Sequence, residues 1–188
     1  MSRVYRIRVR ESVRRHLRAS DHVGTQLELL EILPAEQLAG LLTEELQNRG
    51  FEQQGSVLVR KSDDGVTITV DPQTATVTVE AEAGQHVELE AVDERGYYDR
   101  GGKKQAEAAL RKDLQADLQR RADLQTAELQ KQVTDRLEGH LLDLRKELDQ
   151  VVNRVTAEAL KRKAAQLGQI KEMTEDPQSG SLTIVLEV

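Results

Sequence analysis

The sequence predicts an α+β protein with a small, mostly antiparallel sheet covered by two helices, and a long helical coiled-coil hairpin inserted before a C-terminal strand. Three observations predict this fold. Residues 66–92 alternate apolar and polar side chains between turn-forming residues, as strands with one buried face do. Residues 101–173 contain no proline, and leucine returns there every three or four positions. Residues 181–188 again have the composition of a strand.

These patterns divide the chain into an α+β body at 1–100, a helical arm at 101–173 and a strand at 174–188 that returns to the body. The composition supports an elongated element, because only 2% of the residues are aromatic and 32% are charged. A compact core normally contains several large rings, whereas a paired helix needs only a seam of leucines.

Composition also excludes several classes of protein. The chain has no cysteine, so disulfides and thiolate chemistry are excluded. No apolar run approaches the ~20 residues of a membrane span, and the N-terminus lacks the apolar core of a signal peptide. We therefore expect a soluble, cytoplasmic protein that does not enter a membrane.

The charges are segregated along the chain. Residues 1–18 hold seven arginines and one acid, whereas residues 19–102 hold seventeen acids and five bases. Residues 3–10 alternate with period two, which predicts a strand with one apolar face and one arginine-bearing face. The basic residues of this candidate interaction surface are Arg6, Arg8, Arg10, Arg14 and Arg15, with Arg18 as an extension.

Two interpretations of this arginine surface remain open. It can be a stripe that binds nucleic acid or phosphate. It can also be a solvated face that balances an acidic neighbouring strand. We favour the second interpretation, because no aromatic or glycine-rich element accompanies the arginines and the rest of the body is acidic.

Turn and cap residues place the elements of the body. Thr25 and Glu28 fit a capping box, which predicts one helix, and Pro34 and Gly50 fit the start and end of a second. Four strands joined by turns are predicted next, at residues 56–61, 66–70, 75–82 and 86–92. Gly84 is the predicted turn between the last two. The glycine-rich stretch 93–102 predicts a hinge, and its end lacks the spacing of a phosphate loop.

The long segment has the apolar spacing of a coiled coil. Its best seam consists of Leu137, Leu141, Leu144, Leu148, Val151 and Val155, spaced alternately by four and three residues. A seam this narrow does not stabilise an isolated helix, so we expect it to pair with itself or with another chain.

Two geometries of this segment compete. The heptad register passes through Gly139 without interruption, which favours one continuous helix. A hairpin that reverses near Gly139 would instead return the last strand to the body, where its edges can be paired. We favour the hairpin, and the alternative is a homodimer in which the C-terminal strands are exchanged.

No residue pattern predicts a reaction. The four histidines (His16, His22, His86 and His140) show no metal-ligand spacing, and no nucleophile motif or carboxylate pair is apparent. We therefore expect no enzymatic activity, no cofactor and no metal. The arginine face and the predicted tip of the arm around His140 are the surfaces we expect to bind a partner.

Three stretches resemble a known family: the opening residues 1–12, the strands within 66–79, and residues 158–168 followed by 181–188. Together they resemble an uncharacterised bacterial family of small accessory proteins. Its members are associated with an FtsH-like AAA+ ATPase and a von Willebrand A-domain protein in three-part systems. The resemblance implies an adaptor or regulatory component partnered with one of these proteins, and it supplies no site residues.

The sequence thus yields two functional hypotheses. The first is a non-enzymatic adaptor or scaffold of an ATPase-associated system that binds a protein partner through the coiled-coil arm. The second is a nucleic-acid-binding module that uses the N-terminal arginines.

Overall fold

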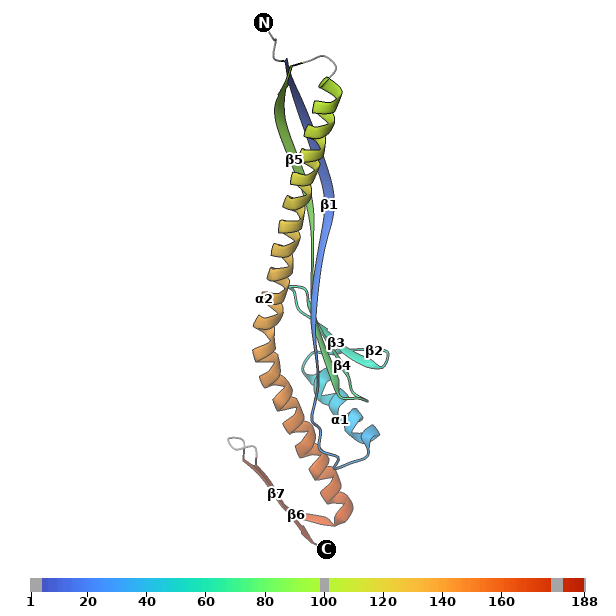
Figure 1. Ribbon diagram of the computed structural model, residues 1–188. Coiled ribbons are helices and arrows are strands. Elements are labelled where there is room, and N and C mark those ends of the chain that lie inside the picture. Colours follow the sequence, from blue (N-terminus) through green and yellow to red (C-terminus); the bar gives the residue numbers. More distant parts are fainter. Residues whose placement is uncertain (1–4, 99–101, 177–180, 188) are drawn as a thin grey trace. The chain divides into compact units, whose positions relative to one another are not determined.

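The computed structural model describes residues 5–98, 102–176 and 181–187. It has an α+β fold with a five-stranded sheet of order β1-β5-β4-β3-β2, as predicted in outline (Figure 1). The strands are β1 (Tyr5–Gln26), β2 (Glu52–Gln54), β3 (Val57–Lys61), β4 (Val66–Asp71) and β5 (Thr76–Tyr97). The helices are α1 (Ala35–Asn48) and α2 (Lys103–Leu167). A separate two-stranded sheet contains β6 (Gln169–Asp176) and β7 (Ser181–Glu187).

The chain forms two compact units. Unit 1 contains residues 1–20 and 82–134, and unit 2 contains residues 21–81 and 135–188. Each unit therefore includes a part of β1, a part of β5 and a part of α2. Within each unit the helical segment packs on strands.

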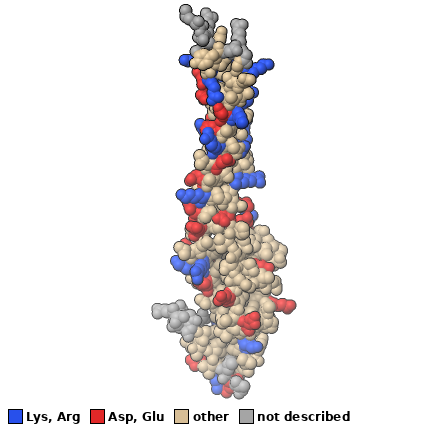
Figure 2. All heavy atoms as spheres, in the orientation of Figure 1, with Lys and Arg blue, Asp and Glu red and all other residues tan. Residues whose placement is uncertain are grey.

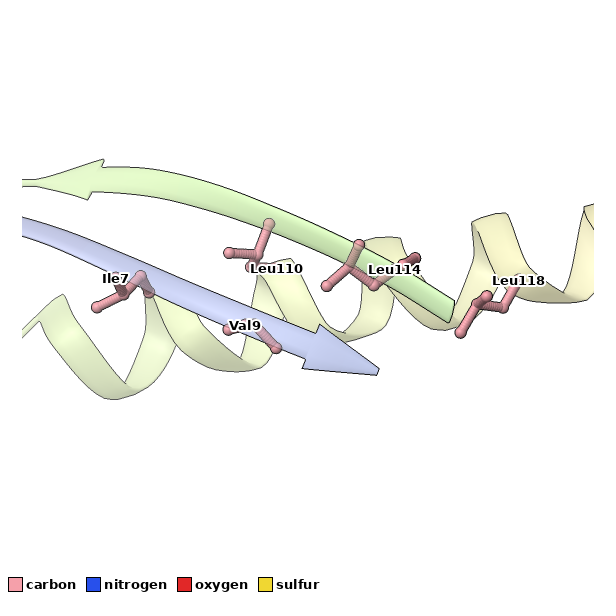
Figure 3. Close-up of a cluster of buried hydrophobic side chains, with 6 residues drawn as sticks. Ile7, Val9, Leu110, Leu114 and Leu118 are labelled. Atoms are coloured by element: carbon pink, nitrogen blue, oxygen red, sulfur yellow. The ribbon is translucent and has the colours of Figure 1, made fainter. Parts of the chain in front are cut away.

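Unit 1 is a two-stranded ribbon with a helix on one face. Ile7 and Val9 of β1 and Ala91 of β5 pack against leucines of α2. Figure 3 shows the two strands running in opposite directions, with the leucine side chains of the helix directed at them. The leucines are Leu110, Leu114 and Leu118. Alternate positions along each strand face away from the helix, so the period-two pattern decides which residues are buried.

Unit 2 has a wider sheet with two helices on its apolar face. Val66, Ile68 and Val70 of β4 are at most 3% exposed, while the threonines between them are half-buried on the opposite face. The antiparallel register places Val70 beside Val77 of β5. Buried leucines of α1 and of α2 cover the apolar face: Leu38, Leu41, Leu42, Leu46, Leu137, Leu144 and Leu148.

The predicted reversal of the helical segment near Gly139 is not confirmed. Residues 138–140 are helical, and α2 continues through them as one helix of 65 residues. The seam needs no second helix, because strand side chains within each unit fill that role. Leu110, Leu137 and Val151 are each at most 2% exposed without a coiled-coil partner.

The C-terminal strand does not join the five-stranded sheet. β7 instead pairs with β6, with Thr174 beside Thr183 and Gln169 beside Glu187. Residues 169–173 were predicted as the end of the helical arm. Their β structure gives β7 a partner strand directly after the helix. The sequence of residues 176–180 is typical of a turn, and residues 177–180 lie outside the described residues.

Two local predictions in the body are also wrong. Thr25 belongs to β1, and residues 27–31 are irregular, so the predicted first helix is absent. The backbone N–H of Leu27 donates to the carbonyl of Ala75 at 2.8 Å, and this contact favours an extended chain over a helical start. Gly84 lies within β5 and makes no turn. The second predicted helix is confirmed as α1, and Gly50 follows it with a φ of 84°.

The glycine-rich stretch is described only in part. β5 extends to Tyr97, whose ring stacks on Tyr5 with centroids 5.5 Å apart, so the first residues of the predicted hinge are strand. Residues 99–101 lie outside the described residues.

Candidate interaction site

Unit 2 has a groove with a volume of about 650 Å³. Its floor is apolar: Val77 and Val79 of β5 and Leu144 and Leu148 of α2 are between 0% and 6% exposed. The end of β1 forms one wall, where Val23 is 39% exposed. Buried apolar side chains thus lie beneath the groove, and polar and apolar groups contribute about equally to its accessible lining.

Hydrogen bonds hold the β1 side of the groove in place. The side chain of Gln26 donates to the carbonyl of Thr74 at 3.0 Å, and the backbone N–H of Leu27 donates to Ala75. Ala75 has a φ of 53°, a left-handed conformation that costs a residue with a side chain about 1–2 kcal/mol. The turn between β4 and β5 thus fixes the chain where the groove begins.

Charged side chains border the groove. Glu28 lies on the β1 side, and Arg145 and Asp149 lie on α2; all three are exposed. Unit 2 as a whole holds twenty-one acids and eleven bases, a net charge of −10. Figure 2 shows that the visible surface over β2–β4 and α1 is largely uncharged. A partner with apolar side chains flanked by basic ones would complement this unit.

An arginine clamp secures α2 in unit 2. Both terminal nitrogens of Arg60 on β3 donate to the carboxylate of Glu147 at 2.7 Å, and its guanidinium lies 4.5 Å from the ring centroid of Phe51. These hydrogen bonds lower the pKa of Glu147 below its ordinary value. The pair is only 27% and 26% exposed, so it is shielded better than most surface ion pairs.

His140 contacts the turn between β3 and β4. Its Nε2 lies 2.6 Å from a carboxylate oxygen of Asp64, and Arg136 donates to the backbone carbonyl of Asp64 at 2.6 Å. The hydrogen bond from His140 lowers the pKa of Asp64. His140 was predicted at the tip of a hairpin; it lies instead in the middle of α2, where it holds a turn of its own chain.

The structure places the N-terminal arginines in unit 1, on two faces of the ribbon. Arg8, Arg10 and Arg14 form ion pairs with glutamates of β5 on the face opposite the helix. The glutamates are Glu94, Glu90 and Glu88. Arg15 points to the helix side and donates to Gln119, and Arg6 is exposed. The acidic neighbouring strand that we expected beside the arginines is therefore β5.

The described residues contain no group of three or more His, Cys, Asp or Glu side chains that could hold a metal ion. In the same part of the chain, no helix combines the length and apolarity needed to cross a membrane.

The fold is α+β, and unit 2 carries a groove between β5, α2 and the end of β1. The model of a family described as FtsH ternary system domain X5 matches residues 1–188, and the chain belongs to this family. This confirms the resemblance seen in the sequence and makes the chain a component of a multiprotein system. Comparisons with curated proteins and with solved structures find no match.

Sequence reasoning predicted the groove residues individually but missed the groove. Val77 and Val79 were placed on the inner face of a strand, and Leu141, Leu144 and Leu148 were placed in the helical seam. Their meeting depends on how a strand and a helix far apart in the sequence pack together. The wall formed by the end of β1 was missed because the capping-box pattern at Thr25 predicted a helix where β1 continues.

Proposed function

We propose that this chain is a non-enzymatic adaptor or regulatory component of an FtsH-associated system, and that α2 contributes its binding surface through the groove of unit 2. The observation that carries the proposal is the groove between β5, α2 and the end of β1, where Val23 exposes apolar surface. The partner is the FtsH-like AAA+ ATPase or the von Willebrand A-domain protein that the family resemblance implies. Its docking segment has an apolar anchor flanked by basic residues.

The dimensions and the charge of the groove support a peptide segment as its occupant. A volume of about 650 Å³ accommodates several side chains. The net charge of −10 on unit 2 attracts a basic segment at long range, and Glu28 and Asp149 provide carboxylates beside the apolar floor.

The seam of α2 is a poorer candidate, although the sequence favoured a coiled-coil contact. Its leucines are buried in contacts with the chain's own strands, so a partner helix would have to displace them. The exposed residues that line the groove are accessible without such a change. We therefore still propose that a partner binds α2, but at the exposed residues that line the groove and not at the buried leucine seam.

Nucleic-acid binding is the weaker alternative. Three of the N-terminal arginines already contact glutamates of β5, and a phosphate backbone would have to compete with those carboxylates. No other feature of the described residues favours it.

The test is binding of the purified chain to each of the two purified proteins, measured by biolayer interferometry. Val23→Asp places a charge on the groove wall, and we expect it to weaken binding about tenfold or more, which corresponds to one lost apolar contact plus a buried charge. Leu142→Asp is the matched control, because Leu142 is 73% exposed on α2 and lies outside the groove.

The two variants give opposite results if the proposal is right. Val23→Asp weakens binding while Leu142→Asp leaves it unchanged, and both retain the circular dichroism of the parent. Equal effects of the two variants, or no binding to either protein, would contradict the proposal.

A further inference from the structure

The ribbon of unit 1 has two strand edges without a described partner strand. β1 is the edge strand of the sheet and pairs only with β5. β4 pairs with β5 only as far as Ala81, so residues 82–97 of β5 have a second edge with no strand among the described residues. Long unpaired edges expose rows of N–H and C=O groups that readily accept another strand.

The two edges carry opposite charges on the face that α2 leaves open. The acidic row lies on β5 and consists of Glu82, Glu88, Glu90 and Glu94. The basic row lies on β1 and consists of Arg6, Arg8, Arg10, Arg14 and Arg18. The ion pairs between the rows and the burial of the alternate residues Ile7, Val9 and Val87 establish this face. Each row therefore lies beside a row of the opposite charge within the ribbon, and its outer side has no charged row beside it among the described residues.

We propose that unit 1 is a self-association surface on which β1 of one copy pairs with β5 of the next. β1 and β5 run antiparallel, so a second copy in the same orientation brings its β1 antiparallel to the free edge of β5 (Figure 3). The sheet then continues, and basic and acidic rows alternate across it. The proposal goes beyond the partner groove, which lies in unit 2.

The spacing of strands and helices fits this arrangement. A ribbon of two strands is about 9.6 Å wide, because neighbouring strands lie about 4.8 Å apart. Copies stacked by that distance bring their α2 segments to the 8–10 Å at which helices pack. The width of the two-stranded ribbon thus matches the distance between packed helices. Neighbouring copies can therefore pair their strands and pack their helices at the same time.

Both flanks of α2 carry charges of both signs, and some of them contact the strands of their own ribbon. On the β1 side, Arg111 of α2 contacts Glu11, and Arg15 of β1 reaches the helix at Gln119. On the β5 side, Asp113 of α2 contacts Arg95.

Symmetric pairing is disfavoured by the same charges. A two-fold contact through β1 would set arginines opposite arginines, and one through β5 would set glutamates opposite glutamates. Like charges directly across a strand pair are destabilising. The favourable contact joins unlike edges, and such head-to-tail contacts leave one edge of each sign free for further copies.

Two charge-reversal variants test the proposal. The first is Arg6→Glu with Arg18→Glu, which places two acids in the basic row of β1. The second is Glu82→Arg with Glu94→Arg, which places two bases in the acidic row of β5. Lys112→Glu is the control, since Lys112 is exposed on α2 away from the ribbon face. The molar mass of each is measured by light scattering over a range of concentrations, at about 0.01 M and about 1 M salt, where the Debye length changes from ~30 to ~3 Å.

We expect the parent and the control to associate with rising concentration, more strongly at low salt. Each reversal variant alone should associate about tenfold less tightly or not at all, because two cross-strand pairs become repulsive. An equal mixture of the two should associate again, since the new acids on β1 of one variant then meet the new bases on β5 of the other. Recovery in the mixture also shows that both variants are folded.

A second measurement needs no substitution. Amide hydrogen exchange of the parent is compared at low and high protein concentration, and we expect slower exchange at high concentration within residues 5–20 and 82–97. A parent chain that stays monomeric at every concentration, with unchanged exchange there, would overturn the proposal. Reversal variants that associate as tightly as the parent would overturn it too.

Discussion

Helix α2 contributes to both units but packs on a different arrangement of strands in each. In unit 1, residues 103–134 of α2 pack on two strands, and the open face of that ribbon consists of paired charges. In unit 2, residues 135–167 pack on a wider sheet beside α1, and a groove with an apolar floor remains open. The leucine spacing is similar in both, so the strands decide which surfaces are left for partners.

Charge separates the units as clearly as packing does. Unit 1 holds sixteen bases and twelve acids, a net charge of +4, against −10 for unit 2. The difference assigns the units different kinds of contact: pairing of unlike strand edges in unit 1, and capture of a basic, apolar segment in unit 2.

The largest expected effect comes from removing a buried leucine in either unit. Leu110→Ala in unit 1 and Leu46→Ala in unit 2 both remove a side chain that is 0% exposed, and each should destabilise its unit by about 2–5 kcal/mol. Because the cluster of unit 1 is small, Leu110→Ala should accelerate hydrogen exchange mainly in residues 5–20 and 82–97. Leu46→Ala should act on residues 57–71. Identical exchange patterns for the two variants would contradict the prediction that each substitution destabilises mainly its own unit.

A smaller difference is expected between two arginine–glutamate pairs. Glu147→Gln removes the charge that Arg60 binds in a shielded position, and should cost about 1.5–3 kcal/mol in the free energy of unfolding. Glu90→Gln breaks the pair with Arg10, whose side chains are 47% and 66% exposed, and should cost at most about 1 kcal/mol. Urea unfolding of both variants measures the two losses in the free energy of unfolding. Equal losses would contradict the prediction.

The Glu147 pair should also make unit 2 sensitive to acid. The pKa of Glu147 is lowered in the folded protein by its hydrogen bonds with Arg60. Its stabilising contribution is therefore complete above its ordinary pKa of 4.5 and is lost as the pH falls from there through the lowered value. Urea unfolding of the parent and of Glu147→Gln should show a gap at pH 7 that narrows in acid. A gap that does not change with pH would contradict this.

The smallest expected effect concerns two neighbouring histidines in unit 1, whose rings are tilted against each other by 44°. The rings of His16 and His86 lie 4.2 Å apart, and the pKa of His16 is lowered by desolvation and by the charges of His86 and Arg18. His86→Gln should raise the pKa of His16 part of the way to 6.5, because desolvation remains. His22→Gln is the control. An NMR titration of the His16 ring checks this, and an unchanged pKa in His86→Gln would contradict the stated cause.

Period-two and helical patterns predicted most elements correctly. The alternation from Tyr5 to Val9 and from Val66 to Val70 predicted the buried faces, and Pro34 and Gly50 predicted the bounds of α1. These signals are local, since each depends on neighbouring side chains and on backbone conformation alone.

The errors arose where distant residues decide the conformation. Gly84 looked like a turn, but it lies within β5, where a Cβ atom would come within 3.2 Å of the His16 ring on β1. Glycine leaves room there for close approach of the His16 side chain, which no local pattern reveals. The capping-box pattern at Thr25 was likewise overridden by pairing of β1 with β5.

The hairpin prediction was wrong for a related reason. The narrow seam around Leu137 and Val151 does require a partner surface, and that inference was sound. The sequence could not show that the partner surface is a face of strands instead of a second helix. The groove was missed for the same reason, because it exists only where β5 and α2 meet.

The central claim is that the seam of α2 is satisfied within the chain, so that a partner uses the groove of unit 2. The most direct measurement is hydrogen exchange of the chain with and without the purified FtsH-like ATPase or von Willebrand A-domain protein that binds it. The account predicts slower exchange in residues 23–28 and 141–152, with buried seam positions elsewhere in α2 unchanged. Protection spread along the whole of α2 with none at residues 23–28 would contradict it.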